Sequence, residues 1–333
     1  MKRSFALILA CLLAVTALFA GCSGHKENKK ESTYASDVEA LGIWDNKTEE
    51  ALPQTVIHKL VTDHFAAPLP KGKTVKKAIF IGYDGYRADG LENIKDKTDG
   101  AIMYLKSQGG LYHAFSGGVA GQNEQHTSTA PSWMAMLTGG WGDYNGITDN
   151  GQEKKADVDT FLTSQAKAGH AVSFTTSWRE HTALSYRPDI VSSIQQGLPA
   201  EYTHQIDDTA TYYQVLKYVA NPAGAKKTAQ EDPDCMFLTL EFTDHVGHDT
   251  GYGNNNEEYI EACQDADTYG YNIIKTIEAR STYAAEDWLI VISTDHGGTH
   301  TGHGGQTPFE RMTWIACNQQ IPVTEDYLNY AVK

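Results

Sequence analysis

Five short, apolar and β-rich runs, three of which lead into an aspartate, constrain the fold of this chain more than any other feature. Such runs are typical of strands that are covered on both faces of a sheet. Segments with helical periodicity alternate with them. This alternation predicts a three-layer α/β/α sandwich with a mostly parallel central sheet. The expected strands are residues 77–83, 171–176, 236–242, 288–293 and 312–316, and the expected helices are residues 50–64, 156–169, 207–220 and 255–280.

Acidic and imidazole side chains gather where three of these strands end. Sites in parallel sheets form beyond the carboxyl ends of the strands, so we expect these side chains to converge. Crowded carboxylates repel one another unless a cation lies between them, and carboxylate with imidazole is a ligand set of catalytic zinc. Any one residue alone is better explained as a turn, cap or surface residue. The joint placement predicts a metal centre formed by Asp84, Asp244, His248, Asp295 and His296, with His303 on a glycine-rich loop that can fold over it.

A hydroxyl side chain precedes a further predicted helix. Pro131 suits a first helical turn, and Gly139 ends the helix, which places Thr129 at its N-terminus. Unpaired N–H groups and the helix dipole there stabilise an anion, such as a phosphate or an alkoxide of Thr129. The alternative is that Thr129 only caps the helix.

Together these segments resemble the alkaline phosphatase superfamily, and most closely its type I phosphodiesterase/nucleotide pyrophosphatase branch, over about residues 77–316. Five motifs occur in the order and spacing of that branch. They are Asp-Gly-Tyr-Arg at 84–87, Thr-Ala-Pro at 129–131 with Thr-Gly at 138–139, Asn-Gly-Ile-Thr-Asp-Asn at 145–150, Asp-His-Val-Gly-His at 244–248 and Asp-His-Gly-Gly at 295–298.

The resemblance implies two Zn²⁺ ions, although other divalent cations could serve. It also implies that Thr129 is the nucleophile and that a phosphothreonine intermediate forms. His300 competes with His303 as the last ligand, and His303 matches the branch better. The implied ligands are Asp84, Asp295, His296 and the Thr129 hydroxyl for one ion, and Asp244, His248 and His303 for the other.

At three positions the sequence differs from related enzymes in ways that affect the expected substrate. Ser132 stands where the branch usually carries Asn, so Ser132, with Ala130 beside it, is the expected substrate contact. Alkaline phosphatases proper hold magnesium through a Glu five residues before the equivalent of Asp244. Thr239 stands there, which favours diesters over monoesters. Formylglycine sulfatases need an Arg four residues after the nucleophile, and Trp133 occupies that place.

The resemblance therefore implies zinc-dependent hydrolysis of phosphate esters, in particular phosphodiesters or nucleotide pyrophosphates. A phosphomonoesterase or phosphotransferase using the same site is the main alternative. A non-catalytic lipoprotein that binds zinc or an anion is a third. Arg179, which follows the strand at residues 171–176, is expected either to bind phosphate or to form a surface salt bridge.

The N-terminus has the pattern of an exported bacterial lipoprotein. Residues 1–21 predict a signal peptide, with a short basic start and an apolar stretch too short to span a membrane. Small residues before Cys22 resemble a lipobox, which implies lipidation there; ordinary cleavage near Ala20 is the alternative. Residues 22–33 would then be a flexible tether from the membrane of the cell envelope, on its periplasmic side or at the cell surface.

The rest of the chain is predicted to be a helical extension at residues 34–72 and a catalytic domain at residues 73–333. The branch normally continues past the last strand, so the domain is expected to be truncated at its C-terminus. Loss of residues 1–21, which contain two basic residues and no acid, would change the formal net charge from −15 to −17. This charge disfavours nucleic-acid polymers but not small phosphate esters, because a metal pair sets the local field.

Overall fold

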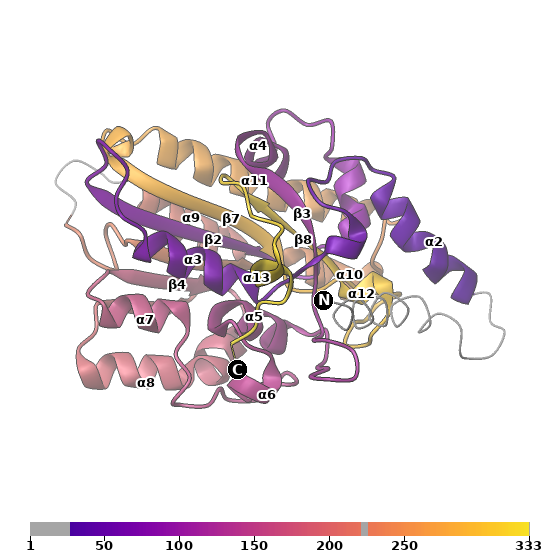
Figure 1. The fold of residues 1–333 in the computed structure, drawn as a ribbon, viewed down its shortest axis with the longest axis horizontal. Coiled ribbons are helices and arrows are strands. Elements are labelled where there is room, and N and C mark those ends of the chain that lie inside the picture. The colour runs from indigo at the N-terminus through magenta and orange to yellow at the C-terminus, as the bar shows by residue number, and fades with distance from the viewer. Residues whose placement is uncertain (1–26, 221–225, 333) are drawn as a thin grey trace, which may run out of the picture.

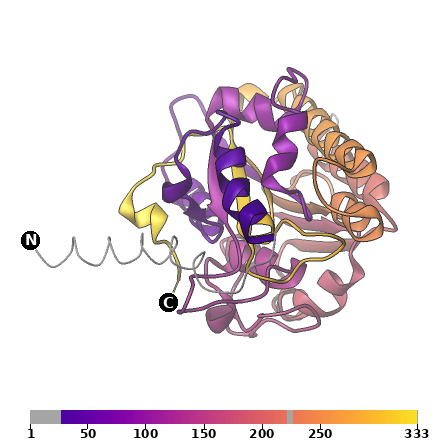
Figure 2. The same ribbon diagram turned by 90° about the vertical axis from the view of Figure 1, so that its right-hand side faces the viewer.

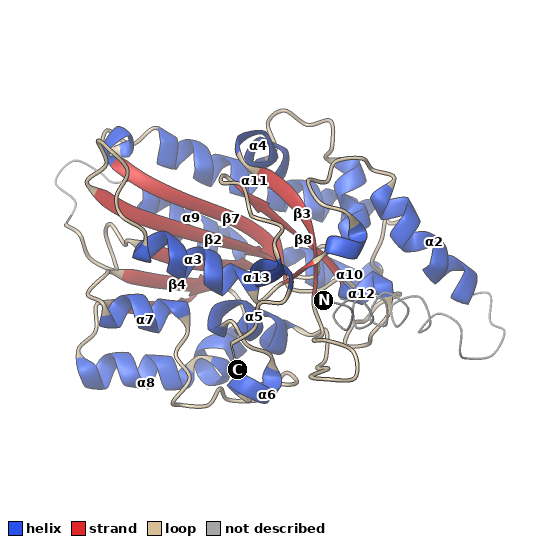
Figure 3. Ribbon diagram, in the orientation of Figure 1, coloured by secondary structure: helices blue, strands red, loops and turns tan. Residues whose placement is uncertain are grey.

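A mixed sheet of eight strands forms the centre of the protein (Figures 1 and 3). The computed structural model describes residues 27–220 and 226–332. The strand order across the sheet is β1-β3-β8-β7-β2-β6-β4-β5. The strands are β1 (Leu52–Pro53), β2 (Val75–Tyr83), β3 (Gly110–Phe115), β4 (Val172–Thr176), β5 (Ala200–His204), β6 (Cys235–Leu240), β7 (Glu286–Thr294) and β8 (Met312–Cys317).

All neighbouring strands are parallel except that β8 runs antiparallel to both β3 and β7. Helices cover both faces of the sheet, which confirms the predicted α/β/α sandwich (Figure 2). The helices are α2 (Glu27–Glu39), α3 (Val56–Ala66), α4 (Ala101–Gln108), α5 (Thr129–Thr138), α6 (Gly142–Asn145), α7 (Phe161–Lys167), α8 (Arg187–Gln196), α9 (Asp208–Val219), α10 (Phe242–Thr250), α11 (Glu257–Glu278), α12 (Pro308–Arg311) and α13 (Glu325–Leu328).

Alternate residues of the central strand β2 enter two separate hydrophobic cores. Ile79, Ile81 and Tyr83 pack with α4, α9 and α11, whereas Ala78 and Phe80 pack with α3, α5 and α7. This alternation follows from the two-residue period of a strand. With both faces buried, the strand is apolar nearly throughout, which is why its sequence was recognisable.

The structure differs from the sequence-based prediction in several elements. The helix expected at residues 156–169 begins only at Phe161, because the Thr160 side chain accepts a hydrogen bond from the Thr163 N–H and caps it there. The helix expected at residues 50–64 begins at Val56. Strands β1, β3 and β5 were not predicted.

Residues 27–33, which were expected to belong to a flexible tether, form the first part of α2. This helix is anchored farther along, where the side chains of Tyr34 and Val38 are buried in the core. The predicted signal peptide and the predicted lipidation site at Cys22 lie outside the described residues. No helix in the described ranges is both long and apolar enough to cross a membrane.

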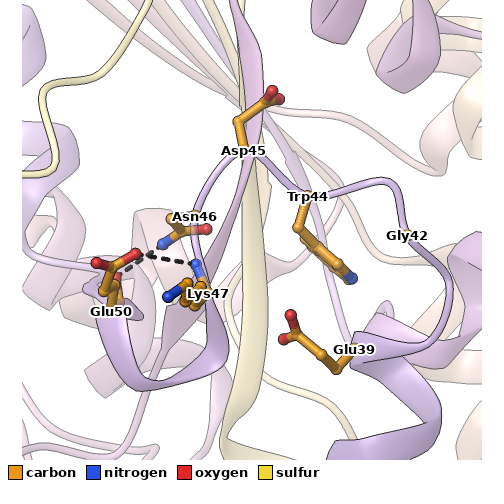
Figure 4. Close-up of a pocket in the computed structure, with 7 residues that line it drawn as sticks. All are labelled: Glu39, Gly42, Trp44, Asp45, Asn46, Lys47 and Glu50. Atoms are coloured by element: carbon orange, nitrogen blue, oxygen red, sulfur yellow. Dashed lines mark hydrogen bonds between the residues drawn. The ribbon is translucent and has the colours of Figure 1, made fainter.

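The segment after α2 is held along the edge of β3, beside a pocket of about 340 Å³ (Figure 4). Trp44 stacks on the His113 ring of β3 with the ring centroids 3.8 Å apart. Glu39 accepts a hydrogen bond from the Thr48 backbone and lies 3.0 Å from His113 Nε2. Asn46 donates to the His113 carbonyl and accepts from its N–H. These polar groups of the pocket hold the segment on the sheet.

Candidate metal centre and active site

The strands that carry the predicted ligands are neighbours in the sheet. β2 lies between β6 and β7 and is parallel to both. Tyr83 pairs with Leu240 on one side and with Thr294 on the other, so the three strands end at the same level. Asp84 and Asp295 therefore leave the sheet side by side, and Asp244 follows in the first turn of α10.

Hydrogen bonds fix one oxygen of each buried carboxylate and leave the other without a partner. Asp295 Oδ1 accepts from the N–H groups of Gly85 at 3.0 Å and His296 at 2.9 Å. Asp84 Oδ2 accepts from the Trp133 indole at 3.3 Å. Within the described part of the chain, Asp84 Oδ1 and Asp295 Oδ2 are buried and have no hydrogen-bond partner. They lie 3.5 and 3.3 Å from His296 Nε2, which has none there either.

Three histidines present the same nitrogen to the cluster. The Nδ1 atom of each lies within hydrogen-bond distance of a backbone carbonyl, which can only accept, so Nδ1 carries a proton and the neutral ring has its lone pair on Nε2. The Nε2 atoms of His248 and His303 are 3.1 Å apart. The hydrogen bond with Asp244 raises the pKa of His248 to about 9, so without a cation a proton on His248 Nε2 lies between this nitrogen and its two acceptors, and a bound cation would replace it. The carbonyl partners are Thr301 for His248 at 2.9 Å, Gly297 for His296 at 2.8 Å and Thr127 for His303 at 3.0 Å.

The donor set fits divalent cations. A buried acceptor left without a partner costs about 1–3 kcal/mol, and here several such acceptors converge. Bound cations would satisfy them, and imidazole nitrogen with carboxylate oxygen suits zinc. Two overlapping groups have ligand atoms within 4.8 Å of one another: Asp84, Asp295 and His296, and Asp244, His296 and His303. His248 Nε2 joins the second group at 3.2 Å from Asp244 Oδ2.

Burial sets the protonation of this cluster when no cation is bound. Burial and then the charge of Asp295 raise the pKa of Asp84 well above its ordinary value. The pKa of Asp295 is raised in the same way, by burial and then by Asp244 and Glu241. Burial, followed by the neighbouring His303, lowers the pKa of His296 to about 3, so this imidazole is neutral. Without a cation, Asp84 and Asp295 therefore favour their protonated forms, whereas the hydrogen bond with His248 outweighs burial and lowers the pKa of Asp244.

The buried carboxyl group of Glu241 should make the stability of the metal-free protein depend on pH. Burial raises its pKa to about 8, from an ordinary value of 4.5. Because folding raises this pKa, the stabilisation by protonated Glu241 is complete below about pH 4.5 and is lost as the pH rises through 8. In chelator, we expect the free energy of unfolding in urea to fall by a few kcal/mol between pH 5 and 9. Glu241→Gln should reduce this fall, and an unchanged slope would contradict the assignment.

The helix that carries Thr129 is bound to the cluster on both sides of this residue. Two residues earlier, the Thr127 carbonyl is hydrogen-bonded to His303. Four residues later, the Trp133 indole donates to Asp84. Ser128, rather than Thr129, is the N-cap of α5, and no described residue hydrogen-bonds the Thr129 hydroxyl. The alternative that Thr129 serves only as a cap is thus without support in the geometry.

His300, His245 and Arg179 lie outside the cluster. The structure brings His303 to the cluster but leaves His300 in an exposed turn, where its Nδ1 lies 3.3 Å from Thr299 Oγ1. His245 is exposed on α10, one residue past Asp244. Arg179 is exposed, and its guanidinium forms no ion pair with a described residue, so the expected surface salt bridge is not found.

The two predicted substrate contacts, Ala130 and Ser132, lie one and three residues after Thr129 on α5. The Ser132 hydroxyl is fully buried and has no hydrogen-bond partner among the described residues. The Ala130 N–H donates to Asn150 Oδ1 at 2.9 Å, so a substrate could use this N–H only by displacing Asn150.

Asn150 is a further candidate for contact with the substrate, and it was not among the predicted site residues. With Oδ1 on the Ala130 N–H, its Nδ2 donor remains next to the N-terminus of α5 and has no partner among the described residues. The Glu180 carboxylate accepts from the adjacent Gly151 N–H at 2.5 Å and holds this loop. Its place in the motif at residues 145–150 was the only sequence signal.

Comparisons with known proteins agree with this architecture. The GPI ethanolamine phosphate transferase 1 of Yarrowia lipolytica is 24% identical over 287 residues, which are 77% of this chain and 28% of the relative. Its Candida glabrata counterpart is 23% identical over 272 residues, 72% of this chain and 27% of the relative. The chain thus spans little more than a quarter of the length of these relatives.

Among solved structures, a 2-O GAG sulfatase shares the fold with a TM-score of 0.50 and 13% identity, over 78% of this chain and 72% of that one. The family model described as type I phosphodiesterase / nucleotide pyrophosphatase matches residues 78–324, the range that holds Thr129 and every strand-end ligand. With most of its length matched, the chain belongs to the type I phosphodiesterase/nucleotide pyrophosphatase family.

Proposed function

We propose that this chain hydrolyses phosphate esters, in particular phosphodiesters or nucleotide pyrophosphates, with two divalent cations, zinc foremost, and with Thr129 as the nucleophile. One observation carries the proposal. Acceptor atoms of Asp84, Asp295 and His296 that have no hydrogen-bond partner among the described residues converge at the N-terminal end of α5, which carries the Thr129 hydroxyl.

The bound cations would supply the positive charge that stabilises the attacking and leaving oxygens of an in-line displacement. Thr129 Oγ1 forms a bond to phosphorus as the bond to the leaving oxygen breaks, and its proton passes to solvent. Water then cleaves the phosphothreonine and restores the hydroxyl group. The N-terminus of α5 favours the negative charge of the phosphoryl group.

Asn150 is proposed to donate to a phosphate oxygen. Its Oδ1 is fixed by the Ala130 N–H, so its orientation is set before substrate binds. The buried Ser132 hydroxyl lies one helical turn from the N-cap and could supply a second donor only after a change of rotamer or the entry of water.

A paired assay tests the proposal. The purified protein, reconstituted with zinc, would be tested with bis-p-nitrophenyl phosphate and with p-nitrophenyl phosphate. We expect a higher kcat/KM for the diester. A preference for the monoester would assign the same site to a phosphatase. No activity on either ester, with two zinc ions bound, would contradict hydrolysis of simple phosphate esters.

Phosphotransfer is the second candidate, because the two fungal relatives that cover most of this chain are named as ethanolamine phosphate transferases. In a transferase, an alcohol instead of water would take the phosphoryl group from Thr129. Adding an acceptor alcohol to the diester assay distinguishes the two. A transferase gives mainly the diester of the acceptor alcohol with p-nitrophenyl phosphate, whereas a hydrolase gives mainly free p-nitrophenyl phosphate.

A further inference from the structure

A buried tyrosine that the proposed chemistry does not use touches the second ligand group. Tyr252 follows α10, and its side chain is almost fully buried. Its hydroxyl donates to Asp244 Oδ1 at 2.5 Å. The other oxygen of Asp244 is left toward the cluster, 3.2 Å from His248 Nε2. Asp244 Oδ1, which accepts from the phenol, also lies 3.8 Å from His303 Nε2, so the phenol holds the carboxylate with one oxygen toward each imidazole.

The Tyr252 ring also forms a wall of this half of the site. Its plane is nearly perpendicular to the rings of His248 and His303, with centroids 5.8 and 6.5 Å away. The ring therefore limits how these two imidazoles can tilt. One side chain thus contacts Asp244, His248 and His303, the three residues expected to hold the second ion.

Glycines make room for this ring. A Cβ atom at Gly298 would lie 2.6 Å from three atoms of the Tyr252 ring, and one at Gly247 would overlap its edge. The ring thus fills space that a larger side chain at residue 298 would take. The ring is aimed back over α10 by Gly251 and Gly253, whose φ angles of +109° and +115° favour glycine. The Tyr252 N–H donates to the His300 carbonyl at 2.8 Å.

We propose that Tyr252 is a positioning residue that fixes Asp244 for binding of the second divalent cation, in space provided by Gly247 and Gly298. This inference rests on the proposed two-metal site. In the free carboxylate both oxygens are equivalent and the group can rotate. With Tyr252 on Oδ1, rotation of the carboxylate is restrained: Oδ2 is held toward His248, and Oδ1 keeps its remaining lone pair 3.8 Å from His303 Nε2. The ligand geometry therefore exists before the ion arrives.

Zinc binding to the purified protein tests this role without reference to turnover. Zn²⁺ affinity of both sites would be measured by competition with a chromophoric chelator, and stability by thermal unfolding in chelator. In Tyr252→Phe, we expect the affinity of one site to fall by about 10- to 100-fold, the range typical of lost outer-sphere hydrogen bonds, while the other site is unchanged. Gly298→Ala, which displaces the ring, should have the same effect.

Two matched controls accompany these variants. Tyr212→Phe changes a buried tyrosine on α9, and Gly302→Ala adds a Cβ that meets nothing within 4 Å in the same loop as Gly298. Neither should change zinc affinity. If Tyr252→Phe lowers only the stability in chelator and leaves both affinities unchanged, Tyr252 is structural and the inference is wrong. If the unmodified protein binds fewer than two ions, the proposed function fails instead.

Discussion

Replacing Thr129 with alanine is expected to lower kcat for phosphodiester hydrolysis by roughly 10³-fold or more, because the attacking oxygen is removed. The Thr129 hydroxyl is one of the four expected ligands of its ion, and the other three, Asp84, Asp295 and His296, are held independently of it. No described residue hydrogen-bonds its hydroxyl, and Ser128 occupies the N-cap. Zinc content and the melting temperature should therefore stay near the values of the unmodified protein, as metal analysis and calorimetry would show.

Thr129→Ser is the matched control, because it keeps the hydroxyl and removes only a methyl group. It should retain most of the activity. If the alanine variant keeps more than about a tenth of the rate, water attacks the substrate directly and the phosphothreonine step is wrong. The covalent intermediate can be sought independently by trapping labelled phosphate on the protein with acid.

The second large effect is expected in Asp295→Asn, which should be more stable than the unmodified protein without metal and less stable with zinc. The amide keeps Oδ1, which accepts from the Gly85 and His296 N–H groups, and replaces the unpartnered Oδ2 with a donor. Without metal, Asp295 must take up a proton to be neutral, whereas the amide is neutral at any pH and offers a donor facing Asp84 and His296. We expect it to be more stable than the unmodified protein by about 1–3 kcal/mol in chelator.

With zinc the order should invert. A ligand that binds only the folded state adds about 4 kcal/mol at a thousand-fold excess over its Kd, and the variant forgoes this at one site. Thermal unfolding in chelator and in zinc measures both effects. Asp249→Asn, at an exposed position on α10, is the control and should respond to zinc as the unmodified protein does. An equal zinc response in Asp295→Asn would remove Asp295 from the ligands.

The central strands and the residues at their ends could be predicted because burial on both faces leaves a plain apolar signal. β2, β6 and β7 all carry it. β5 does not, because it lies at the sheet edge, is only partly buried and carries Glu201 and His204. β3 begins at Gly110 and contains His113, whose polar neighbours are far away in the sequence.

Parts of the candidate site depended on loop paths that no periodicity encodes. His300 and His303 lie three residues apart in one glycine-rich loop, and a turn closed by paired hydrogen bonds between Thr299 and Gly302 separates them. Asn150 reaches the N-terminus of α5 across a loop. Tyr252 was not identified because the space for its ring depends on Gly298, far along the chain, as well as on the nearby Gly247.

The segment that packs on β3 has a consequence for self-association. The outward backbone groups of an edge strand are a template for pairing with another chain. On β3, the N–H and carbonyl of Leu111 pair with Asp45, those of His113 pair with Asn46, and the Phe115 carbonyl accepts from the Gln54 N–H. This edge is therefore closed within the monomer. The outermost strand on this side, β1, has only two residues, and its Pro53 has no N–H to donate. Intermolecular β-pairing, and any aggregation that grows from it, is therefore expected mainly at the short, polar edge at β5.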